Sequence, residues 1–351
     1  MSFYKILGDD LRIDKSRNRL NNVLRGCVFP TRGSVPYPRV EWEEPLPRIP
    51  IDTFHASCIP AGLRLEFIAK GDQLIIDFEV IRPSENLMKF LDLNRLLRPT
   101  FHQGFELWDS SRFVSFVEIN GNEQFVKLPL EPGENRLTVY LPELIPLRVK
   151  GIEALKGSIA AVDPGPRWLA YGDSITEGWS SNYSGYSWAN TLARKIDLDL
   201  VNFGYGGSAR GEVAIAEQIA GQQAEVISIC YGTNCWSRVV HSKNLFAEGL
   251  KVFVEILRRS QPNVPIVAIS PLLRPDAESQ KNTQGASLGD LRDIFEGFFR
   301  RLINEGDDNI VLVEGFDLIM EKDLVDGVHP GNNGHQKVAE ALVRPFTSVL
   351  K

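Results

Sequence analysis

Cysteine and long apolar runs are both scarce in this 351-residue chain. None of the four cysteines, Cys27, Cys58, Cys230 and Cys235, forms a C-x-x-C pair, which argues against a disulfide framework, a zinc knuckle and a redox motif. No run of about 18 apolar residues occurs, so we expect no membrane-spanning helix and no membrane partner. The first residues lack the apolar segment of a secretion signal, which favours a cytoplasmic protein with reduced thiols.

An excess of positive charge is also absent. The chain carries 39 Lys and Arg against 45 Asp and Glu, a net charge of −6 at pH 7. A mildly acidic chain is a poor general ligand for nucleic acid, so no nucleic-acid partner is expected. Its 43% hydrophobic and 24% charged residues are typical of a globular protein of about two domains. This composition is compatible with a homo-oligomer.

Up to about residue 160, apolar residues recur with period two, which is typical of β-strands. The predicted strands are 63–69, 74–80, 112–119, 125–128, 137–141 and 147–152. Lys70-Gly71-Asp72 predicts a hairpin between the first two, and Asn120-Gly121 predicts another between the third and fourth. No stretch of this half predicts a helix. We expect residues 1–160 to form an antiparallel sandwich or jelly roll.

After Pro164-Gly165-Pro166 the pattern changes to alternating strands and helices. Strands are predicted at 167–171, 198–203, 224–230, 264–270 and 310–313, and helices at 187–196, 212–220, 245–260, 288–305 and 334–350. This alternation is typical of a parallel sheet covered on both faces. In such a fold the functional loops follow the carboxyl ends of the strands. We expect residues 161–351 to form this α/β domain.

Residues capable of serine acyl chemistry follow these strands. Ser174 can act as nucleophile if a base takes its proton, and His329 can be that base. Asp326, three residues earlier, can orient His329 and stabilise its cation. The Ser174 N–H, the Gly207 N–H and the Asn234 side-chain amide can stabilise the oxyanion. These roles need no metal and no cofactor.

Four sequence blocks resemble those of the SGNH, or GDSL-type, hydrolases. The blocks are Gly172-Asp173-Ser174-Ile175, with Ile in place of the usual Leu, then residues 202–207, then Gly232-Thr233-Asn234, and finally Asp326-x-x-His329-Pro330. They occur in the family's order within residues 165–351. The third block departs from the family because Cys235 stands where Asp usually follows the asparagine.

The resemblance implies a flavodoxin-like three-layer fold and ester hydrolysis or acyl transfer without metal. It also implies that Ser174, His329 and Asp326 act as nucleophile, base and acid, and that Gly207 and Asn234 serve the oxyanion. The β-rich first half resembles the jelly-roll domain that precedes the hydrolase in some carbohydrate esterases and acyltransferases.

Other interpretations of the same residues remain open. Ser174-x-x-Glu177 matches a helix capping box. Asp326 and His329 together with His335 could hold a metal, although we expect His335 to be structural. Gly285-Ala286-Ser287-Leu288-Gly289 matches a nucleophile elbow, but a polar loop precedes it, so Ser287 is better explained as a helix N-cap with Asp290. Residues 204–209 match a dinucleotide fingerprint, without the acidic residue that such a site needs.

The sequence therefore predicts a serine esterase that hydrolyses a short, acetyl-like ester, with a carbohydrate as one candidate alcohol. Trp179, Tyr205 and Trp236 are candidate substrate-binding residues because aromatic faces are common anchors. The alternatives are an acyltransferase that uses the same residues and an inactive carbohydrate-binding protein.

Overall fold

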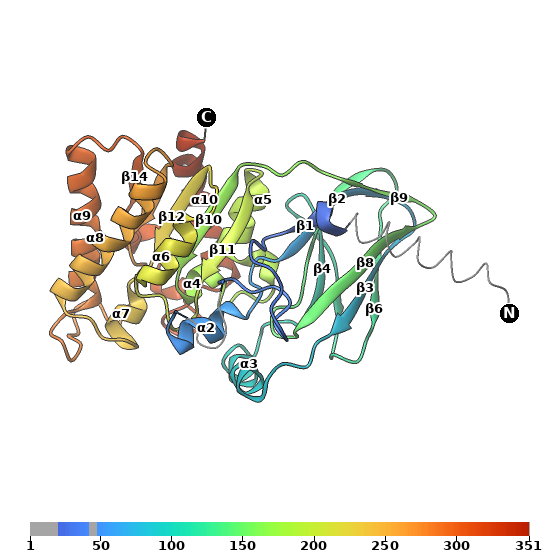
Figure 1. The fold of residues 1–351 in the computed structure, drawn as a ribbon, viewed down its shortest axis with the longest axis horizontal. Coiled ribbons are helices and arrows are strands. Elements are labelled where there is room, and N and C mark those ends of the chain that lie inside the picture. Colours follow the sequence, from blue (N-terminus) through green and yellow to red (C-terminus); the bar gives the residue numbers. More distant parts are fainter. Residues whose placement is uncertain (1–19, 42–47, 351) are drawn as a thin grey trace.

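The computed structural model describes residues 20–41 and 48–350 (Figure 1). Its strands are β1 (Leu24–Arg25), β2 (Arg64–Lys70), β3 (Gln73–Val80), β4 (Gly104–Asp109), β5 (Arg112–Glu118), β6 (Phe125–Pro129), β7 (Asn135–Tyr140), β8 (Leu147–Leu155), β9 (Ser158–Ala161), β10 (Arg167–Gly172), β11 (Asp199–Gly204), β12 (Val226–Cys230), β13 (Ile266–Ile269) and β14 (Ile310–Val313). Its α-helices are α2 (Ile51–Ser57), α3 (Glu85–Leu97), α4 (Ser174–Glu177), α5 (Trp188–Lys195), α6 (Val213–Ala220), α7 (Thr233–Ser237), α8 (Lys243–Ser260), α9 (Leu288–Asn304) and α10 (Asn332–Val349). Short 3-10 helices are η1 (Ser184–Tyr186), η2 (Phe316–Leu318) and η3 (Glu321–Asp323). No helix within the described ranges is long and apolar enough to cross a membrane. The start of the chain, where we expect no secretion signal, lies outside the described residues.

The C-terminal part is a five-stranded parallel sheet in the order β11-β10-β12-β13-β14. This is the flavodoxin-like order, so the predicted α/β fold class is confirmed. Helices α6, α8 and α9 pack on one face of the sheet, and α5 and α10 on the other. Every strand and helix predicted between residues 167 and 350 is present. β11, β12 and β13 are buried from end to end, which is why short continuous apolar runs identified them.

The N-terminal part is a sandwich of two antiparallel sheets, as predicted. One sheet has the order β1-β2-β7-β4-β5, with β9 paired to β2, and the other has the order β6-β3-β8. Their inner faces share one apolar core, which includes Leu65, Phe67, Leu74, Ile76, Phe105, Leu128 and Val139. We call this part, β1 to β9, the β-sandwich.

Both predicted hairpins of the β-sandwich are wrong, although their strands exist. β2 pairs with β7, whereas β3 pairs with β8 along its whole length in the opposite sheet. The connection at Gly71 crosses between the sheets, and its φ of +146° and its close approach to the Leu155 carbonyl leave no room for a side chain. Alternation of apolar and polar residues indicates which face of a strand is buried, but not which strand lies next to it. β2 and β3 both alternate in this way although they are not neighbours.

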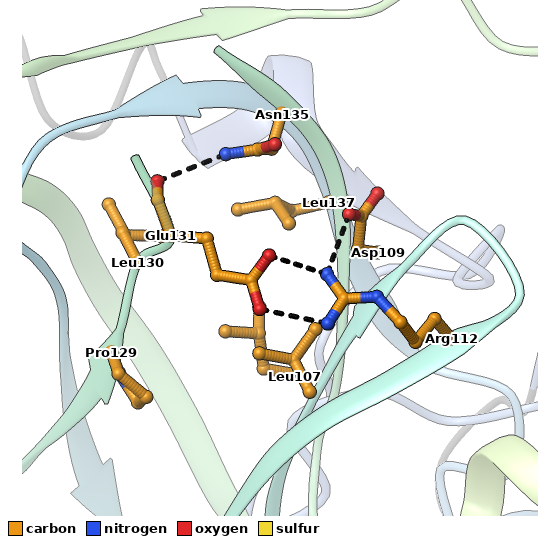
Figure 2. A pocket seen from close by; sticks show the side chains of 9 residues that line it. Leu107, Asp109, Arg112, Pro129, Leu130, Glu131, Asn135 and Leu137 are labelled. Atoms are coloured by element: carbon orange, nitrogen blue, oxygen red, sulfur yellow. Dashed lines mark hydrogen bonds and ion pairs between the residues drawn. The ribbon is translucent and has the colours of Figure 1, made fainter. Parts of the chain in front are cut away.

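The second predicted hairpin fails in the same way, because β5 pairs with β4 and β6 pairs with β3. Figure 2 shows a point where the two sheets meet. Arg112 at the start of β5 donates to both carboxylate oxygens of Glu131, just after β6, at 2.8 and 2.7 Å, and reaches Asp109 at 3.0 Å. The Arg112 and Glu131 side chains are about half-exposed and screened by solvent. Their ion pair therefore contributes little to stability.

The prediction that the first half contains no helix is also wrong. The Ser84 side chain caps α3 by accepting from the Leu87 N–H at 3.4 Å. This helix buries Leu87 and Leu91, four residues apart, while Leu93, Leu96 and Leu97 stay exposed. Leucines on both faces blur the helical stripe, so the pattern carried no clear 3.6-residue period.

Residues between β1 and β2 pack into the α/β part. Phe29, Val40, Ile49 and Ala56 belong to the same apolar core as the faces of β10, β11 and β12. Arg64 on β2 forms a buried ion pair with Asp199 on β11 at 3.2 Å. The segment between β1 and β2 is therefore part of the α/β core, whereas the β-sandwich has an apolar core of its own. The domain boundary near residue 160 stays a prediction.

Candidate active site

Ser174 lies at the carboxyl end of β10, where the strand turns directly into α4. Asp173 is the N-cap of this helix, and its side chain accepts from the Ile175 N–H at 3.0 Å. Ser174 is thus the first helical residue and not the cap, which excludes the capping-box interpretation of Ser174. A side chain at Gly172 would clash with Thr176 and the Cys230 carbonyl, so the tight turn requires glycine there.

The structure brings Ser174, His329 and Asp326 together in one hydrogen-bonded chain. Ser174 Oγ lies 2.7 Å from His329 Nε2, and His329 Nδ1 lies 2.7 Å from Asp326 Oδ2. Asp326 Oδ1 accepts the backbone N–H groups of Val328 and His329 at 3.0 and 2.8 Å. Because a carboxylate only accepts, Nδ1 carries the imidazole hydrogen and Nε2 accepts from the Ser174 hydroxyl.

Asp326 is held in its charged form. Burial raises its pKa, but the hydrogen bond and charge of His329 and the two backbone N–H groups outweigh burial and bring the pKa well below its usual value. A permanent carboxylate at Nδ1 stabilises an imidazolium when His329 takes a proton. The arrangement can therefore withdraw the proton of Ser174 as its oxygen attacks.

The predicted oxyanion donors come from loops that end at the same sheet edge. β10 pairs in parallel with β11 and with β12, and Gly172 lies beside both Gly204 and Cys230. Gly207 has a φ of +74° and open space where a side chain would start. Among the described residues, neither the Ser174 N–H nor the Gly207 N–H donates to a protein acceptor. These amides are therefore available to a ligand.

Asn234 is the second residue of α7 and is buried. Its side-chain amide reaches only the Ala209 carbonyl, at 3.4 Å, and this long bond leaves donor capacity for a ligand. Cys235, which replaces the family's Asp, is fully buried, and burial raises the pKa of its thiol well above the usual value. Burial raises the pKa of the Cys230 thiol in the same way, which disfavours the reactive thiolate form of both residues.

Asn234→Ala is expected to lower kcat for an ester substrate by about 10²- to 10³-fold, because one preorganised oxyanion donor is lost. KM is expected to change little, and steady-state kinetics measures both. Ser237→Ala is the matched control, since its side chain lies on the same short helix and bonds only the Thr233 carbonyl, at 3.1 Å. Equal kcat values for the Asn234 variant and the unaltered chain would remove Asn234 from the oxyanion site.

The three candidate substrate-binding aromatics are placed differently. Tyr205 is fully buried, and its hydroxyl donates to the Arg39 carbonyl at 2.9 Å, so its prediction as a substrate-binding residue is wrong. Its ring points under the loop, into the core, and not toward solvent. Trp179 is partly exposed, and its ring centroid lies 5.2 Å from that of His329. Trp236, also partly exposed, lies on α7 below the Arg274 guanidinium. Trp179 and Trp236 stay candidates.

The competing motifs have structural explanations. Ser287 caps α9 in a capping box with Asp290, which confirms the expected helix start. His335 is fully buried, accepts the Trp188 N–H at 3.2 Å and donates to the Trp179 carbonyl at 2.9 Å. Burial lowers its pKa to about 4, and with both nitrogens engaged it is a structural residue rather than a metal ligand beside His329.

The glycine-rich turn after β11 is unsuited to a dinucleotide phosphate. The Gly206 N–H donates to the carboxylate of Glu177 at 2.7 Å, so an anion already occupies that amide. Helix α6 starts only at Val213, several residues after the glycine-rich turn. Its N-terminus therefore does not directly follow the glycines, as it does in a dinucleotide phosphate site.

The buried ion pair of Glu177 and Arg39, which lies next to this site, was not predicted from the sequence. Glu177 appeared only as part of a capping motif, and Arg39, which contacts it, lies 138 residues earlier in the chain. No spacing rule joins residues so far apart, and Arg39 belongs to no motif.

Comparisons with known proteins agree with this geometry. The model of the GDSL-like Lipase/Acylhydrolase family matches residues 167–347. Among solved structures, the chain is similar to the salicylyl-acyltransferase SsfX3 from a tetracycline biosynthetic pathway, with a TM-score of 0.76, 21% identity and coverage of 93% of this chain and 94% of that one. It is also similar to a putative GDSL-like lipase from Bacteroides ovatus, with a TM-score of 0.71, 18% identity and coverage of 93% and 95%.

A family two carbohydrate esterase from Clostridium thermocellum, in complex with cellohexaose, matches with a TM-score of 0.60 and 18% identity, over 82% of this chain and 92% of that chain. At these identities the likeness establishes the fold. No curated protein sequence matches the chain.

Proposed function

Because the chain belongs to the GDSL-like lipase/acylhydrolase family, we propose that it is a serine esterase in which Ser174, His329 and Asp326 carry the reaction. The observation that supports this most directly is the unbroken chain of two 2.7 Å contacts from Ser174 Oγ through His329 to Asp326. A binding protein without activity has no need for an imidazole so oriented, which argues against the inactive carbohydrate-binding alternative.

In the proposed reaction, Ser174 Oγ attacks the ester carbonyl carbon while His329 Nε2 takes the hydroxyl proton. The oxyanion that forms accepts hydrogen bonds from Gly207 N–H, Ser174 N–H and the Asn234 amide. His329 then returns the proton to the departing alcohol oxygen, which leaves an acyl-Ser174. Water repeats the attack with the same proton transfers and releases the carboxylic acid.

The proposed substrate is a small-molecule ester with a short, acetyl-like acyl group, because no long apolar lid segment occurs in the sequence. A carbohydrate is the preferred alcohol, since several solved structures of similar fold are carbohydrate esterases. An acyltransferase is the second candidate, since the solved salicylyl-acyltransferase has both parts of this fold, and acyl transfer differs only in the acceptor of the acyl group.

Hydrolysis of p-nitrophenyl acetate and p-nitrophenyl octanoate by the purified chain tests this function. We expect turnover of the acetate at a higher kcat/KM than the octanoate, and one fluorophosphonate bound per chain, at Ser174 by peptide mass. Faster octanoate turnover would contradict the short acyl group. Absence of both turnover and labelling in folded protein would contradict the esterase proposal.

Partition of the acyl group separates the two enzyme candidates. A hydrolase releases acetate even when alcohols are added, whereas a transferase shows a single burst of p-nitrophenol that becomes turnover only with an acceptor alcohol. The second pattern would favour the acyltransferase.

A further inference from the structure

The buried carboxylate of Glu177 contacts two loops of the candidate active site, one at Gly206 and one at Trp179. Glu177 lies three residues after Ser174 on α4, and its side chain is 1% exposed. Its Oε2 accepts the Gly206 N–H at 2.7 Å, and its Oε1 accepts the Trp179 indole N–H at 3.0 Å. Gly206 precedes Gly207, and the Trp179 ring lies beside His329, so this carboxylate joins two loops at the site.

The charge of Glu177 is balanced by arginines from the N-terminal half. Arg39 Nη2 lies 3.3 Å from Oε2, and Arg98 Nη1 lies 3.9 Å from Oε1, with both guanidinium groups as buried as the carboxylate. A buried carboxylate without partners is costly. Arg39 is the nearer cationic partner of Glu177, because Arg98 also donates from both Nη atoms to the buried Glu143 carboxylate at 3.2 Å.

Arg39 also binds the end of β11, where the glycine-rich loop begins. Its guanidinium donates to the carbonyls of Asn202, at 3.2 Å, and Gly204 at the end of β11, and to that of Ala56 at 2.7 Å. The loop from Gly204 to Gly207 is thus held at its start by Arg39 and in its middle by Glu177. A side chain at Gly206 would lie 2.6 Å from Trp179 Nε1, so the loop packs directly onto these groups.

We propose that Glu177, fixed by Arg39 and Arg98, is a positioning residue that sets the Gly207 N–H and the Trp179 ring relative to Ser174 and His329. The N-terminal half is then a component of the active site and not an accessory. This inference rests on the proposed esterase function. Its physical basis is that oxyanion donors stabilise a transition state only when they are fixed before charge develops.

A second buried ion pair between the two halves provides a matched control. Arg64 Nη2 lies 3.2 Å from Asp199 Oδ1, and both side chains are almost fully buried. Asp199 begins β11, whereas Gly204 ends it, so this pair lies about 16 Å from the active-site edge along the strand. Breaking it perturbs the same junction without touching the site.

The test compares Glu177→Gln with Asp199→Asn in the full chain. We expect Glu177→Gln to lower kcat for p-nitrophenyl acetate by roughly 3- to 30-fold with little change in KM, measured well below the melting temperature. Asp199→Asn is expected to lower the melting temperature with kcat within about twofold. A folded Glu177→Gln chain with unchanged kcat would overturn the proposal.

Hydrogen exchange gives a readout that does not depend on esterase activity. By NMR, the Gly206 amide and the Trp179 indole N–H should exchange at least about tenfold faster in Glu177→Gln than in Asp199→Asn. Equal protection in both variants would overturn the positioning role even if the chain proved not to be an esterase. If Glu177→Gln fails to fold, Gly206→Ala displaces the same loop with all charges kept, and unchanged kcat and exchange there would equally refute the proposal.

Discussion

Ser174→Ala is expected to lower kcat for p-nitrophenyl acetate by about 10⁴-fold or more, to the residual rate that binding and oxyanion donors alone can support. The acyl group then has no serine oxygen to which it can transfer. The fold should persist, because the Ser174 side chain makes its hydrogen bond to His329 and does not cap α4. Steady-state kinetics, together with loss of fluorophosphonate labelling, measures the effect.

Ser287→Ala is the matched control for this prediction, since Ser287 lies in the competing G-x-S-x-G motif. Its side chain caps α9, so its loss should cost about 1 kcal/mol of stability and leave kcat unchanged. The reverse pattern, with activity lost at residue 287 and kept at 174, would show that the wrong serine had been assigned.

His329→Ala is expected to have an effect of the same size, because the Ser174 hydroxyl then has no acceptor for its proton. Combining it with Ser174→Ala should add almost nothing, since residues that act as one unit are not additive. Asp326→Ala is expected to reduce kcat less, because a base remains although its tautomer and cation are no longer supported.

Single, double and control variants would be compared by kcat on p-nitrophenyl acetate. His55→Ala is the control, since His55 packs near Phe90 and belongs to no part of the site. A His329→Ala chain with near-normal kcat would exclude His329 as the base. Multiplying losses in the double variant would show that the two residues act separately.

The α/β part was predictable because each of its elements carries a strong local signal. A strand such as β12 is buried on both faces and is therefore a short apolar run, and α8 and α9 are long amphipathic helices. The parallel direction of the strands then follows from the helices that connect them. Sequence and structure agree here because local pattern and tertiary packing require the same residues.

The β-sandwich was predictable only in part. Alternation located β2, β3, β5 and β6 correctly, but the choice of neighbour is a long-range property. β3 lies against β8, some seventy residues onward, because that pairing extends over its full length. The short connection at Gly71, which usually closes a hairpin, here turns the chain from one sheet into the other.

The same distinction between local and distant signals holds at the site. The spacing of Asp326 and His329 and the strand-end position of Ser174 were enough to predict that they meet. The contacts of Arg39 and Arg98 with Glu177 were not predictable, because ion pairs between distant residues leave no periodic trace. Tyr205 failed as a prediction because a residue beside the glycine turn can point into the core as readily as outward.

The packing of the segment between β1 and β2 into the α/β core has a consequence for how the chain is made. Phe29 packs edge-on against Phe203 of β11, with ring centroids 6.2 Å apart. This contact cannot form until β11 has been synthesised. Contacts that close such long loops slow folding, and the early segment stays exposed on the ribosome until then. The apolar side chains between β1 and β2 are therefore not fully packed until the second half of the chain has been synthesised.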